Sequence, residues 1–90
     1  MKKLQLRYVA CVYPLTGIME EEWDSEVNTI RELLEELDGS YGGFRDLFIN
    51  KESGRLNLNA MIYYGEEGKV PFAVIDLDQP VQDRAKLMFW

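Results

Sequence analysis

The sequence contains no histidine and only one cysteine. Without an imidazole, Ser-His-Asp and Cys-His nucleophilic sites and the common zinc sites are excluded. The single thiol, Cys11, cannot form an internal disulfide, and its apolar neighbours predict a packed, unreactive side chain. The sequence therefore predicts a protein that is not an enzyme, binds no cofactor and works in the reducing cytoplasm.

Long apolar runs are also missing. Gln5 and Arg7 interrupt the N-terminal segment before it could form the core of a signal peptide, and no run approaches the roughly 18 apolar residues of a membrane span. We therefore expect neither signal-directed export nor contact with a membrane. Hydrophobic residues still make up 47% of the 90 residues, which is too many for disorder. This length fits a single small globular domain over residues 1–90.

Hydrophobic periodicity predicts the element order β-α-β-β-β. Residues 3–13 alternate between apolar and polar side chains, as in a strand with one buried face. Residues 18–38 carry apolar side chains at spacings of three and four, which is typical of an amphipathic helix. Further strands are predicted over 44–50, 56–64 and 70–77.

Two local signals refine this order. Thr16 is a candidate N-cap for the predicted helix, and Pro71 places the strand at 70–77 on a sheet edge, because proline donates no amide hydrogen. The C-terminal segment stays open between two structures. Pro80 favours a short helix, which we prefer, whereas the apolar run 87–90 suits a buried strand. The predicted fold is a two-layer α+β sandwich: a four-stranded, mainly antiparallel sheet with one long helix across one face.

Three glycines follow the predicted helix within five residues. A phosphate-binding loop precedes a helix, so that its amides and the positive end of the helix dipole face the anion. These glycines come at the opposite end, beside acidic residues. We interpret Gly39 as the left-handed residue that ends the helix, and Gly42 and Gly43 as a tight turn.

The negative charge is concentrated in the predicted helix. Residues 20–38 carry nine acids and one base, whereas the other 71 residues carry seven acids and nine bases. The last turn is acidic although the helix dipole favours cations there, so stability alone does not explain the pattern. One interpretation is a solvated face that promotes solubility, and the other is a docking face for a basic protein surface. The predicted partner-binding residues are Glu21, Glu32, Glu35, Glu36 and Asp38.

The preferred hypothesis is a non-enzymatic inhibitor whose carboxylates replace nucleic-acid phosphates on a basic partner. Small phage inhibitors of restriction or CRISPR systems are similar in size and charge, although no motif is shared. Direct nucleic-acid binding is not expected, because the basic residues are scattered.

Two other functions stay open. A small adaptor or homodimeric subunit would use an apolar sheet face. Its predicted interface residues are Tyr13, Met61, Tyr63, Phe89 and Trp90. A metal-dependent enzyme would use Asp76 and Asp78, which lie two apart near a predicted strand end and could bind magnesium. The simpler interpretation of these two carboxylates is that they cap the segment that follows.

Overall fold

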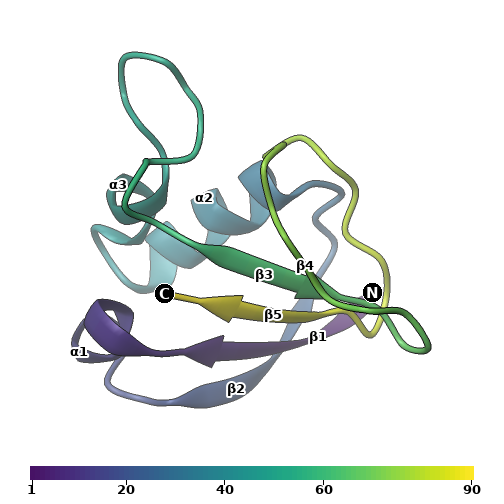
Figure 1. The fold of residues 1–90 in the computed structure, drawn as a ribbon. Helices are drawn as coiled ribbons and strands as arrows, with labels where there is room; N and C mark the ends of the chain where they lie inside the picture. The colour runs from purple at the N-terminus through teal and green to yellow at the C-terminus, as the bar shows by residue number, and fades with distance from the viewer.

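A computed structural model describes all residues from 1 to 90. The chain forms two layers, a sheet and a layer of helices that lies across one of its faces (Figure 1). In order the elements are β1 (Lys2–Tyr8), the 3-10 turn η1 (Ala10–Val12), α1 (Tyr13–Thr16), β2 (Glu20–Ser25), α2 (Ile30–Ser40), α3 (Phe44–Phe48), β3 (Ile62–Gly65), β4 (Phe72–Ala73) and β5 (Lys86–Phe89). None of the helices has the length and apolar character needed to cross a bilayer.

The sheet has five strands in the order β2-β1-β5-β3-β4. The last strand, β5, lies in the centre, parallel to β1 and antiparallel to β3 (Figure 1). The prediction of an α+β fold with helical cover on one face is confirmed, but the predicted four strands are wrong, because the sheet has five. It is mixed: three strand pairs are antiparallel, as expected, whereas β1 and β5 are parallel. The preferred C-terminal helix is also wrong, because Leu87 and Phe89 fill the core from a central strand.

The core lies between the sheet and α2. Every second residue of β1, β5 and β3 faces it, and α2 and α3 supply the opposite wall. Phe89 is fully buried at its centre, with ring centroids 5.8 Å from Tyr8, 5.2 Å from Phe44 and 5.5 Å from Phe48. Aromatic pairs at these separations contribute beyond the area they bury. The C-terminal strand therefore holds the two layers together.

The predicted helix over 18–38 is correct only in its second half. Residues 20–25 form the edge strand β2, where Trp23 pairs with Leu4 of β1 and burial alternates along the strand. The helix begins at Ile30 and its N-cap is Thr29, whereas Thr16 ends the short helix α1. The sequence Thr-x-x-Glu at 29–32 forms a capping box, a signal that was present in the sequence.

Several other boundaries differ from the prediction. Residues 44–48 form the helix α3, not a strand, and Gly43 at φ 94° is its N-cap. The strand at 3–13 ends at Tyr8, and the strand at 56–64 is confined to β3. Gly39 lies inside α2 instead of ending it. The expected sheet-edge position of the strand after Pro71 is confirmed by β4.

The central aromatic cluster gives a first prediction. Phe89→Ala should reduce the free energy of unfolding by about 3–5 kcal/mol, because the removed ring leaves a cavity between two layers. Met88→Ala, one residue earlier on the opposite face of β5, should cost clearly less. Urea denaturation of both variants measures the difference, and equal losses would contradict the central role of Phe89.

Candidate functional site

Glu21, the first predicted partner-binding acid, lies on β2 and not on a helix. Its Oε2 accepts hydrogen bonds from the Tyr8 hydroxyl at 2.5 Å and from the Tyr41 hydroxyl at 2.8 Å. Burial and these bonds raise the pKa of Tyr8, and they raise the pKa of Tyr41 to about 12. The carboxylate therefore connects an edge strand to the core and to the loop after α2.

The other four predicted acids also have partners within the molecule. Glu32 accepts from the amides of Asn28 and Thr29, which completes the capping box. The Glu35 carboxylate is 2.9 Å from Arg45 Nη1, and Glu36 accepts from Trp23 Nε1 at 2.6 Å.

Asp38 accepts from the amides of Gly43 and Arg45, at the beginning of α3. This contact, like those of Glu35 and Glu36, connects the last turn of α2 to another element of the fold. Intramolecular structure thus accounts for acids at a helix end where the dipole alone would disfavour them.

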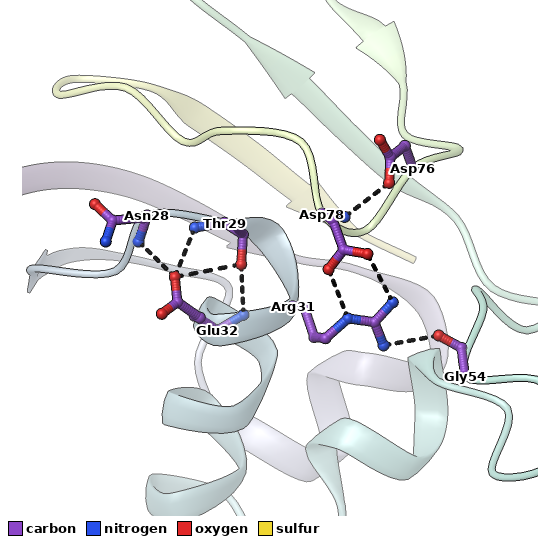
Figure 2. Close-up of polar contacts among 7 residues, drawn as sticks. All are labelled: Asn28, Thr29, Arg31, Glu32, Gly54, Asp76 and Asp78. Atoms are coloured by element: carbon purple, nitrogen blue, oxygen red, sulfur yellow. Dashed lines mark hydrogen bonds and ion pairs between the residues drawn. The ribbon is translucent and has the colours of Figure 1, made fainter.

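Asp76 and Asp78 form part of a polar cluster that joins three segments (Figure 2). Asp76 Oδ1 accepts from the Asp78 amide at 2.9 Å, and Asp78 accepts from Arg31 Nε at 2.8 Å. Arg31 Nη1 also donates to the carbonyl oxygen of Gly54 at 2.7 Å. Arg31 holds the pKa of Asp78 below its ordinary value.

No group of three or more His, Cys, Asp or Glu side chains is arranged to hold a metal ion. The geometry gives the Asp76 and Asp78 carboxylates a structural role. They fix the loop before β5 against the first turn of α2, where Arg31 N donates to the Leu77 carbonyl oxygen.

The predicted apolar interface residues are divided between core and surface. Phe89 is fully buried, so its assignment to an interface is wrong. Tyr13, Met61 and Trp90 are 44%, 42% and 45% exposed, and Tyr63 is half-buried on the open side of the sheet. The Trp90 amide donates to the Met61 carbonyl oxygen, so these two residues are neighbours at the end of β5.

Cys11 is exposed, so the prediction of a packed thiol is wrong. The strand that would have buried it ends at Tyr8, and Cys11 lies on the turn η1, next to Ala10 at φ 53°. Cys11 lines a cavity of about 450 Å³ together with Leu47, Leu58 and Trp90, among others.

A groove lies over the sheet face that the helices leave open. This open-face groove has a volume of about 790 Å³, and residues of β1, β5 and β3 line it, including Gln5, Lys86 and Tyr63. The sequence prediction missed the contribution of Arg84 and Lys86, because it favoured a helix there. The sequence did contain a weak signal for a strand at residues 86–89. Leu87 and Phe89, which are buried in the structure, alternate with Lys86 and Met88, which are not.

Comparison with solved structures identifies the fold. The chain resembles SAMP1 from Haloferax volcanii with a TM-score of 0.72 and 15% identity, covering 98% of this chain and 92% of that one. It resembles a putative molybdopterin converting factor, subunit 1, from Pyrococcus furiosus with a TM-score of 0.62 and 19% identity, covering 99% and 95%. It also resembles a chain of the BexX/CysO complex of Amycolatopsis orientalis with a TM-score of 0.70 and 16% identity, covering 97% and 92%.

These likenesses define a small α+β protein with the ubiquitin-like fold and a mixed five-stranded sheet. No protein-family model matches the chain, and no curated protein matches it by sequence.

The inhibitor hypothesis is wrong, as is the related description of the protein as a nucleic-acid mimic. The structural neighbours are a small archaeal modifier, a converting-factor subunit and a component of a two-protein complex, not inhibitors. Mimicry of a nucleic acid would also have required one continuous acidic helix. In the structure this segment is divided between an edge strand and a shorter helix.

The Glu21 contacts give a prediction about pH. Glu21→Gln should lower the pKa of Tyr41 from about 12, because a neutral amide no longer opposes formation of the phenolate. Absorbance titration of the folded protein measures this, with Tyr41→Phe to assign the signal and Tyr13→Phe as the control.

In the wild type the folded-state pKa of Tyr41 is raised above the ordinary value of 10.0, so stability should decline as pH rises through the interval between the two values. An unchanged Tyr41 titration in Glu21→Gln would contradict the assigned contact.

The Arg31–Asp78 ion pair gives a prediction in acid. The depressed pKa of Asp78 means that the pair stabilises the fold above the ordinary value of 3.8. This contribution is lost as pH falls through the depressed pKa. Asp78→Asn should therefore be less stable than the wild type at neutral pH, with a difference that disappears in strong acid.

Asp76→Asn is the matched control, because its amide oxygen can still accept from the Asp78 amide. Thermal denaturation across the pH range compares the three proteins. If Asp78→Asn is still less stable than the wild type below both the folded-state and the ordinary pKa of Asp78, the ion pair is not the cause of the difference.

Proposed function

We propose that this protein is a small ubiquitin-like modifier or carrier that acts through protein partners and performs no catalysis itself. The observation that supports this most strongly is the likeness of nearly the whole chain to proteins described as a modifier and as a converting-factor subunit. The absence of enzymatic activity expected from the sequence agrees with this class, because a modifier or carrier is acted on by other proteins.

The position of β5 suits such a role. Strand β5 is central, but it ends at Phe89, and Trp90 is 45% exposed beyond it. In Figure 1 the C-terminus lies at one end of the sheet, on the side where α1 is found. A partner can therefore reach the residue that follows β5 without opening the sheet.

A protein partner is also the class of ligand that the comparison with the BexX/CysO complex supports. The finer expectations from the sequence stay predictions: a partner with a basic surface, a homodimer and a cytoplasmic location. Measuring the solution mass of the purified protein decides whether it forms a homodimer.

The proposed function predicts a covalent or sulfur-bearing form in cells of the source organism. The N-terminally tagged protein should be recovered under fully denaturing conditions either as adducts of higher mass or with one oxygen exchanged for sulfur. Intact-mass spectrometry distinguishes these two forms.

A parallel purification under native conditions is the control, because it also retains partners that bind without a covalent bond. Recovery of only the unmodified chain under denaturing conditions, with no partner under native conditions, would overturn the proposal.

A further inference from the structure

We propose that the open-face groove binds an acidic segment of a protein partner. This inference depends on the proposed function only in that the partner is a protein. The groove lies on the face of the sheet opposite α2, and residues of β1, β5 and β3 form its floor. None of the three functions considered from the sequence assigned a cationic surface to this face.

The strand register defines the floor of the groove. Residues that alternate with the core residues point outward, and the pairing aligns them in rows across the sheet. One row holds Arg7, Met88 and Tyr63, and the next holds Gln5, Lys86 and Gly65. A small apolar centre, formed by Met88 and Tyr63, is thereby placed beside cationic side chains.

The charge of the groove is opposite to that of the protein. The whole chain carries a net charge of −6, yet five of its ten basic residues and only three of its sixteen acids line the groove. The basic residues are Lys3, Arg7, Lys69, Arg84 and Lys86, and the acids are Glu22, Glu66 and Glu67. The groove therefore carries a net charge of +2, and all remaining residues together carry −8.

Two of these cations are free for an external partner. Lys3 is 3.8 Å from Glu22 and Lys69 is 3.6 Å from Glu66, so two of the acids are already paired. Arg7 contacts Glu20 at 3.7 Å on the exposed surface.

Arg84 and Lys86 form no ion pair. Their carboxylate neighbour Asp83 instead accepts from the Lys3 amide at 2.9 Å.

Backbone contacts hold the two residues that carry these cations. The Arg84 amide donates to the Lys3 carbonyl oxygen at 2.9 Å, and Arg84 holds a left-handed φ of 65° in the turn before β5. Lys86 is the first residue of β5 and pairs with Gln5. A partner thus meets two charged side chains that extend from an ordered backbone, so no backbone entropy needs to be lost at these residues on binding.

An acidic protein segment fits this surface better than a nucleic acid does. A nucleic acid needs an extended basic surface to replace its counterions, whereas Glu66 and Glu67 border the groove and the whole protein is anionic. Carboxylates on a peptide can meet Arg84 and Lys86, while an apolar side chain covers Met88 and Tyr63. Charge complementarity of this kind directs association and selects partners.

A synthetic peptide of alternating glutamate and leucine, with a fluorescent label, is the probe. It should bind the wild-type protein more weakly as salt is raised, and a peptide with glutamine in place of glutamate should not bind. The double variant Arg84→Glu/Lys86→Glu should bind the acidic peptide at least about tenfold more weakly. Arg84→Gln/Lys86→Gln, which removes charge without reversing it, should give a smaller loss.

Lys51→Glu/Arg55→Glu is the matched control, because it changes the net charge equally at residues that do not line the groove. Circular dichroism verifies that each variant is folded. Equal weakening by the control, or failure of the wild type to bind the peptide, would overturn the proposal.

Two other occupants are tested in the same series. Binding of single-stranded DNA instead of the peptide, with the same sensitivity to Arg84 and Lys86, would overturn the proposal in favour of a nucleic acid. Self-association that excludes the peptide and is lost in the double reversal would overturn it in favour of a second copy. Peptide binding by a protein that forms no covalent or sulfur-bearing species would retain this inference while the proposed function fails.

Discussion

The structure depends on the insertion of the last strand between the first and the third. Strand β5 pairs with β1 on one side and β3 on the other, so the sheet is interrupted until residues 86–89 are in place. Phe89 then contacts aromatic rings from β1 and α3. Because these contacts join the two ends of the chain, they carry a loop-closure cost that only the completed core offsets.

The acidic segment is better explained by this architecture than by its net charge. Strand β2 is a sheet edge, and its Glu20 and Glu22 lie opposite Arg7 and Gln5 of β1. Charged edge strands oppose pairing with other molecules. Glu21 points to the other face of β2, where its carboxylate accepts hydrogen bonds from the hydroxyls of Tyr8 and Tyr41. Side chains alternate between the two faces of a strand, so neighbouring glutamates of β2 have different structural roles. In a helix these residues would not alternate in this way.

The two faces of the sheet differ in their surroundings, because the inner face packs against the helices and the outer face lines the open-face groove. The inner face and the helices use most of the apolar side chains, and the acids at the end of α2 bond within the helical layer. The outer face retains Arg84 and Lys86 without ion pairs. The ubiquitin-like fold does not determine a function by itself, since function belongs to surfaces built on a fold. The open-face groove carries a net charge of +2, opposite in sign to the −6 of the whole chain.

The sequence alone predicted an α+β fold, a strand within residues 3–13, a helix within residues 18–38 and an edge strand after Pro71. The structure keeps residues 3–8 of that strand and residues 30–38 of that helix, and it places the strand after Pro71 at the sheet edge. These features follow from local periodicity and from the missing amide of proline. Tertiary structure decided that residues 20–25 form a strand, that residues 86–89 lie in the sheet centre, and that Arg84 and Lys86 share a groove with Arg7. The physical reason is that short segments satisfy helical and extended patterns equally well, so pairing with distant strands determines which conformation buries their apolar side.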